Sequence, residues 1–177
     1  MKLSRGFMVF FFVGIAAILG CNGCRDKKGS QEVDISKMQE DLILDNRLKQ
    51  QKERERIDTF VHQKGWPMMQ TGTGLRYWVY HSTDGDSIQE KDEVKLAYQV
   101  MLLNEQVLYS ADSLAPITVT VGHDNIESGL HEALQLMKKG ERAKFILPAH
   151  LAFGFTGDSD KIPQDATVLY DIQVLNR

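Results

Sequence analysis

The stretch Val94-Lys95-Leu96-Ala97-Tyr98-Gln99-Val100-Met101-Leu102 carries the pattern that decides the fold of this 177-residue chain. Large apolar residues occupy every second position, starting at Val94. Side chains along a β-strand point alternately to its two faces. The alternation therefore predicts one long strand with a single buried face.

Two shorter segments, residues 75–80 and 117–121, repeat this alternation. Three more segments are predicted as strands, residues 107–110, 143–147 and 168–175. One segment between them, residues 129–139, has helical spacing instead. Its apolar face would consist of Leu130, Ala133, Leu134 and Met137, and Gly140 would end it. Short strands combined with a single helix indicate an α+β fold. We expect an antiparallel sheet of five to six strands wrapped on this short helix.

A second, much longer helix is predicted before the sheet, because residues 34–64 contain no proline or glycine and are mostly good helix formers. Apolar residues recur at helical spacing near both ends, at Ile35, Met38 and Leu42 and again at Ile57, Phe60 and Val61. The middle, residues 49–56, is polar all round and is typical of a solvated helix. This helix could pack on the domain, pair with a second copy, or hold the domain away from a membrane.

Composition excludes several classes of protein. With 42% hydrophobic and 25% charged residues, the chain is typical of globular proteins. A formal charge of −3 argues against a nucleic-acid partner. Two cysteines, both near the N-terminus, exclude a disulfide scaffold. The five histidines lack metal-ligand spacing, so no metal and no cofactor are expected.

The N-terminus has the pattern of a secretory signal peptide. Lys2 and Arg5 precede an apolar run at residues 7–19, which is shorter than the ~20 residues that a membrane-spanning helix needs. The following Ile18-Leu19-Gly20-Cys21 resembles a bacterial lipobox, which implies that Cys21 is lipidated and becomes the mature N-terminus. An uncleaved signal anchor is the alternative. The polar residues 22–32 would form a tether.

Four blocks, in order, resemble the FKBP-type peptidyl-prolyl isomerases. They are residues 121–134, 137–144, 148–154 and 162–175. The third, Pro148-Ala149-His150-Leu151-Ala152-Phe153-Gly154, is similar to the family's P-x-x-(L/Y)-A-Y-G. The chain would then divide into a signal peptide (1–20), a lipidated tether (21–32), a helical spacer (33–66) and an FKBP-like domain (67–177). This layout resembles the envelope lipoprotein members of the family, including those associated with gliding motility.

The resemblance implies a set of site residues. Its catalytic positions fall on Tyr98, Tyr109, Phe153 and Tyr170. Its substrate-binding positions fall on Ile117, Ile126, Leu130, Ile162 and the main-chain N–H of Glu127. Rotation about an X–Pro bond needs no acid, base or nucleophile, so an apolar pocket lined with rings is the expected signature.

Three positions depart from the family pattern. Ser110 stands where an aspartate is usual, Leu130 replaces a tryptophan, and Phe153 replaces a tyrosine whose hydroxyl binds a substrate carbonyl. We therefore expect a weakened isomerase, tethered in the bacterial envelope with its domain facing the periplasm and acting on X–Pro segments of exported proteins. The alternative is a non-catalytic chaperone or scaffold of the same fold, and a homodimer through the long helix stays open.

Overall fold

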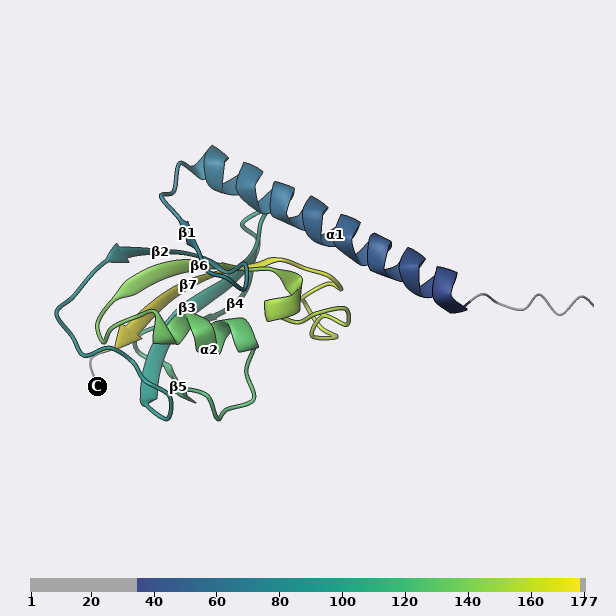
Figure 1. Ribbon diagram of the computed structural model, residues 1–177. Helices are drawn as coiled ribbons and strands as arrows, with labels where there is room; N and C mark the ends of the chain where they lie inside the picture. The colour runs from purple at the N-terminus through teal and green to yellow at the C-terminus, as the bar shows by residue number, and fades with distance from the viewer. Residues whose placement is uncertain (1–34, 176–177) are drawn as a thin grey trace, which may run out of the picture. The chain divides into compact units, whose positions relative to one another are not determined.

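The computed structural model describes residues 35–175, and a compact unit of the chain begins at Ser36. The sheet and its helices belong to this unit (Figure 1). The elements in chain order are α1 (Ile35–Lys64), β1 (Met69–Gln70), β2 (Arg76–His81), β3 (Glu93–Leu102), β4 (Val107–Ala111), β5 (Ile117–Thr120), α2 (Ser128–Gln135), β6 (Arg142–Leu147), the 3-10 turn η1 (Ala149–Leu151) and β7 (Val168–Leu175). The predicted α+β class, with a long helix before an antiparallel sheet and one short helix, is confirmed.

The sheet has seven strands in the order β1-β2-β6-β7-β3-β4, and β5 pairs with β3 outside this path. All pairings are antiparallel. The predicted long strand is β3, which pairs with β7 from Lys95 to Leu102 along one edge. Its other edge is shared, with β5 at its first half and β4 at its second. The two-residue β1 has no alternation and was not predicted.

Helix α2 packs on one face of the sheet, as Figure 1 shows. Its Leu130, Ala133 and Leu134 are buried together with Leu96, Val100, Phe145 and Tyr170 from the strands. Gly129 permits this contact, because a Cβ there would lie 2.8 Å from both the Leu147 side chain and the Leu151 carbonyl oxygen. The first turn of α2 is therefore pressed against β6 and η1.

The predicted extent of this helix is wrong at its C-terminal end. Helix α2 ends at Gln135 and not at residue 139. The main chain after it bonds to residues 86–88 instead: Met137 accepts a hydrogen bond from the N–H of Ile88, and Lys139 donates one to Asp86. Met137 is still buried, so its apolar spacing reflects packing in the core and not a further helical turn.

The C-terminal half of α1 packs on the opposite face of the sheet. Ile57 and Phe60 form a second buried cluster with Met101, Ile146 and Leu169. In contrast, Met38, Leu42 and Leu48 in the N-terminal half are about half exposed. Of the three arrangements considered for this helix, packing on the domain therefore applies to its last turns.

We predict that Ile57→Ala lowers the free energy of unfolding by about 2–5 kcal/mol, because it leaves a cavity under α1. Arg54→Ala is the control, since Arg54 lies on the same helix and is exposed; we expect it to change the free energy by less than about 0.5 kcal/mol. Urea denaturation of both variants measures the difference. Equal stabilities would show that α1 does not pack on the sheet in solution.

Candidate functional site

A cavity of about 270 Å³ opens on the side of the sheet that carries α2. Its walls come from β3 and β7, from β4 and β5, from the start of α2, and from the segment between η1 and β7. Eight of the nine residues predicted from the family resemblance line it: Tyr98, Tyr109, Ile117, Ile126, Glu127, Leu130, Phe153 and Tyr170. Residues far apart in the sequence thus meet in one apolar hollow.

Ile162 is the predicted residue that the structure places elsewhere. Its side chain is buried in the core at 3% exposure and does not line the cavity. Its N–H donates a 2.7 Å hydrogen bond to Asp158 Oδ1, so it supports the cavity wall from behind. Ser110 also lies away from this hollow and lines a separate, polar recess.

Four lining residues were not predicted. The alternation could have identified three of them, because Leu96, Val100 and Ile172 lie on the same strand face as Tyr98 or Tyr170. Asp158 lies in an irregular segment, where no periodicity marks its direction. Cys21, the predicted lipidation site, lies outside the described residues.

The floor of the cavity is a pair of tyrosines. The rings of Tyr98 and Tyr170 are 6.4 Å apart, and Tyr170 is 3% exposed. Burial raises the pKa of Tyr170, and the charge of Glu127 and a hydrogen bond to it add to this effect. Burial and the charge of Glu127 also raise the pKa of Tyr98. Both phenols therefore stay protonated at neutral pH.

Glu127 also offers a main-chain donor at the cavity wall. It is the N-cap of α2, with φ −60° and ψ 139°. Its carbonyl accepts the N–H groups of Leu130 and His131, whereas its own N–H donates no hydrogen bond within the described part of the chain. A bound carbonyl oxygen is the group that such an N–H is suited to hold.

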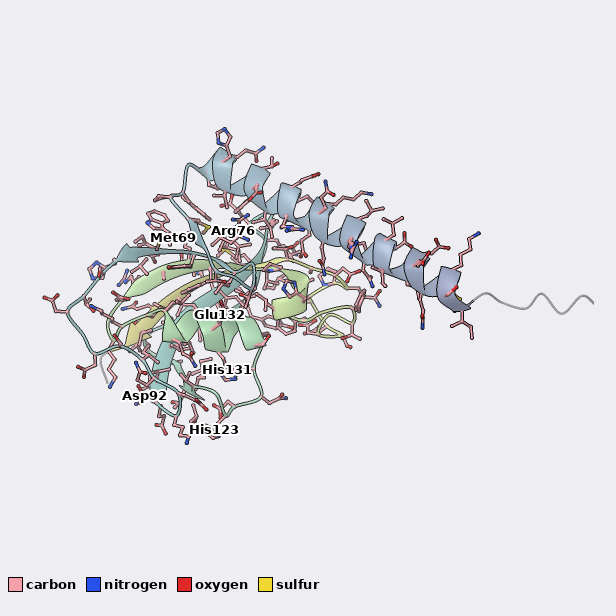
Figure 2. The ribbon with its side chains drawn as sticks, in the orientation of Figure 1. Met69, Arg76, Asp92, His123, His131 and Glu132 are labelled. Atoms are coloured by element: carbon pink, nitrogen blue, oxygen red, sulfur yellow. The ribbon has the colours of Figure 1, made fainter. Side chains whose placement is uncertain are left out.

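Helix α2 fixes the turn that leads into Glu127. The N–H of Gly122 donates to His131 Nδ1 at 2.9 Å, so the ring proton must lie on Nε2, which is 3.0 Å from the Asp124 carbonyl oxygen. The next residue, Glu132, accepts the hydroxyl of Thr73 with both oxygens, at 2.8 and 2.9 Å. His131 and Glu132 are labelled on α2 in Figure 2. The helix thereby holds segments on both of its sides.

The outer wall of the cavity is held by a phenol–carboxylate pair. The hydroxyl of Tyr109 on β4 donates to Asp158 and also lies 3.2 Å from Asp160. Lys161 Nζ lies 4.6 Å from the centre of the Tyr109 ring. The hydrogen bond to Asp158 raises the pKa of Tyr109. The segment that carries Phe153 and Asp158 is thus fastened to β4 at its middle.

The same contacts change the acidity of Asp158. Burial would raise its pKa, but hydrogen bonds from Tyr109 and from the N–H groups of Asp160 and Ile162 outweigh burial and lower the pKa from 3.8 to about 2. The carboxylate is therefore charged throughout the physiological range. Among residues 35–175 no cluster of histidine, cysteine or carboxylate side chains is arranged to hold a metal ion.

We predict that Tyr109→Phe raises the pKa of Asp158 toward 3.8, since it removes the phenol donor. In the wild type, the unfolded chain takes up this proton near pH 3.8 and the folded chain only near pH 2. The stabilisation by this pair is therefore complete above about pH 4 and is lost as the pH falls toward 2. An NMR titration of the Asp158 carboxyl carbon measures the shift, with Tyr77→Phe as the control. The same titration curve in wild type and Tyr109→Phe would rule out the pair.

Comparisons with known proteins agree with this geometry. The family description "FKBP-type peptidyl-prolyl cis-trans isomerase" matches residues 85–175. A probable FKBP-type peptidyl-prolyl cis-trans isomerase of Haemophilus influenzae is 32% identical over 114 residues, which are 64% of this chain and 46% of that protein. FkpA of Escherichia coli K12 is 28% identical over 142 residues, or 80% of this chain and 49% of FkpA. The chain thus spans about half the length of these curated relatives.

Solved structures of this family are similar in fold. The crystal structure of FkpA from Escherichia coli is similar with a TM-score of 0.62 and 26% identity, covering 80% of this chain and 64% of that one. A peptidyl-prolyl cis-trans isomerase from Pseudomonas syringae is similar in fold, with a TM-score of 0.61 at 19% identity. The matched segment holds every residue that lines the cavity and makes up half of the sequence, and we conclude that the chain belongs to the FKBP-type peptidyl-prolyl cis-trans isomerases.

Proposed function

We propose that this protein is a peptidyl-prolyl cis-trans isomerase that acts on X–Pro segments of other proteins, with the cavity at Tyr98 and Tyr170 as its active site. The observation that carries the proposal is an apolar hollow lined by several aromatic rings, with a main-chain donor at its edge, the N–H of Glu127, that has no partner among residues 35–175. Tyr98, Tyr109, Phe153 and Tyr170 would surround the twisted imide. Ile117, Ile126 and Leu130 would complete the apolar contact.

Rotation about an X–Pro bond needs no acid or base catalyst. The barrier to rotation is ~18–20 kcal/mol, because the amide loses its resonance in the twisted state. That state places less charge on the carbonyl oxygen, so a cavity that excludes water favours it over the planar ground state. The Glu127 N–H would hold a neighbouring carbonyl oxygen of the chain, and the protonated hydroxyl of Tyr98 is a second donor nearby.

The rate should be lower than that of a pocket with the full family pattern. Phe153 lacks the hydroxyl that would bind a substrate carbonyl, a loss of about 0.5–1.5 kcal/mol. Leu130 keeps the cavity apolar but offers less contact area to a proline ring than an aromatic side chain would. These departures also favour the second candidate, a chaperone or scaffold that binds proline segments without turnover.

We predict that the purified full chain accelerates isomerisation of a Leu-Pro or Phe-Pro peptide, measured by a protease-coupled assay. The Tyr98→Ala, Tyr170→Ala double variant should fall to the uncatalysed rate, because it removes the cavity floor. A Tyr80→Ala variant controls for loss of an aromatic residue outside the cavity. If the wild type binds the peptide but isomerises it at the uncatalysed rate, the isomerase proposal is wrong and the second candidate, a binding protein without turnover, is favoured.

We further propose that the protein is an envelope lipoprotein similar to the gliding-motility-associated members of the family. The support is the sequence around Cys21, which lies outside the described residues, together with the division into signal peptide, tether, spacer and domain. Within residues 35–175 no helix has both the length and the apolar character to cross a membrane. A lipid on Cys21 would hold the domain in the periplasm, where exported proteins are its clients.

We predict that Cys21→Ser moves the protein from the membrane fraction to the soluble fraction, because the thiol that carries the lipid is lost. Cys24→Ser is the matched control and should stay with the membrane. Fractionation followed by immunoblotting distinguishes the two variants. If Cys21→Ser sediments like wild type, an uncleaved signal anchor is the better interpretation.

A homodimer through α1 is part of the proposal. The N-terminal half of this helix exposes Met38, Leu42, Ile43, Leu44 and Leu48, each by roughly half. Apolar side chains gathered on one part of a helix are typical of a protein interface. A second copy of the chain would bury this surface.

A further inference from the structure

Helix α1 touches the domain through charged side chains as well as through its apolar cluster. Asp58 pairs with Arg76 and Lys64 pairs with Glu105, whereas Glu53 bonds to the domain through its carboxylate. Glu53 lies in the polar middle of the helix, one turn before Ile57. Its Oε1 accepts two hydrogen bonds, from the N–H of Ala149 at 2.8 Å and from the hydroxyl of Thr167 at 2.6 Å. Ala149 is 8% and Thr167 is 6% exposed, so water has little access to either donor.

These two donors stand at opposite ends of one segment. Ala149 begins η1, and Thr167 directly precedes β7. The chain between them carries Phe153 and Asp158, which both line the cavity. A single carboxylate oxygen from α1 therefore ties together the two ends of the segment that forms the outer wall of the site.

The wall has further supports between its ends, since Leu151 and Ile162 are buried in the core and Lys161 Nζ lies 3.3 Å from the Leu108 carbonyl oxygen. Tyr109 holds its middle through Asp158, and the N–H of Asp165 donates to the Gly154 carbonyl oxygen at 3.0 Å. Phe155 is 65% exposed, and Lys49 Nζ of α1 lies 5.6 Å from the centre of its ring. Among the described residues of α1, Glu53 is the one that forms hydrogen bonds with the two ends of this segment.

We propose that Glu53 is a positioning residue for the site, through which helix α1 sets the shape of the cavity. The proposal rests on the isomerase function proposed above. Without the carboxylate, the Ala149 N–H and the Thr167 hydroxyl are left buried and unpaired, which is costly. The ends of the wall would then move to reach water, and Phe153 would move with them.

Four substitutions in the full chain, one of them a control, test this. Glu53→Ala removes the acceptor, whereas Glu53→Gln keeps a carbonyl oxygen that can accept both bonds. Glu55→Ala is the matched control, because Glu55 is exposed on the same helix and its side chain accepts a hydrogen bond from Gln51, its one side-chain partner in the described part of the protein. Thr167→Val removes one donor with little change in volume and decides the matter should Glu53→Ala fail to fold.

Two measurements are made on each variant: kcat/KM on the Leu-Pro peptide, and hydrogen exchange of the amides in residues 149–167. For Glu53→Ala we expect kcat/KM to fall by about five- to tenfold, which corresponds to the loss of about one good hydrogen bond. We expect exchange in this segment to become at least about tenfold faster. Glu53→Gln should stay within about twofold of wild type, Thr167→Val should be intermediate, and Glu55→Ala should be unchanged.

The outcomes separate this inference from the proposed function. If wild type has no turnover, the isomerase proposal fails and the exchange measurement alone decides on Glu53. Exchange in residues 149–167 that is as slow in Glu53→Ala and Thr167→Val as in Glu55→Ala would overturn the inference. Faster exchange with unchanged kcat/KM would overturn it equally, since the wall would then be loosened without consequence for the site.

Discussion

The antiparallel register between β3 and β7 is the constraint on which the rest of the structure depends. It places Tyr98 opposite Ile172 and Val100 opposite Tyr170, so that both tyrosine rings lie on the α2 side of the sheet. A slip by one residue would turn every side chain of one strand to the other face. The floor of the cavity therefore exists only in this register, and both faces of the sheet are buried in ways that enforce it.

Packing on the opposite face of the sheet also stabilises this register. Met101 pairs with Leu169, and both lie under Ile57 and Phe60 of α1. The strands that present the cavity floor on one side thus present the docking surface of the long helix on the other. Because Ile146 on β6 belongs to the same cluster, α1 stabilises three adjacent strands at once. The helix is a part of the folded domain over its last turns and more than a spacer.

The family resemblance predicted eight of the twelve residues that line the cavity. Local pattern in the sequence predicted both helices and every strand except β1. It failed where side chains act through isolated polar contacts. Glu53 lies in a stretch that is polar all round, and its partners are 96 and 114 residues away, so no local pattern distinguishes it from its solvated neighbours. The role of Asp158 is likewise not predicted by local sequence pattern, because its partner Tyr109 is 49 residues away. The end of α2 was predicted too far along the chain, because Met137 continues the apolar spacing of the helix. Its carbonyl oxygen instead accepts a hydrogen bond from the N–H of Ile88.

An apolar cavity needs walls that are placed by something other than its own contents. Dispersion contacts are weak individually and have little directional preference, so rings on an irregular segment can shift at small cost. Here the shift is opposed by directional bonds: the carboxylates of Glu53 and Asp158 hold the wall, and His131 holds the turn before Glu127. Each charge is paired with donors at the margin of the cavity and leaves its centre apolar. The polar groups thereby fix the geometry, and under the proposed function the rings would provide the apolar surroundings in which an imide rotates.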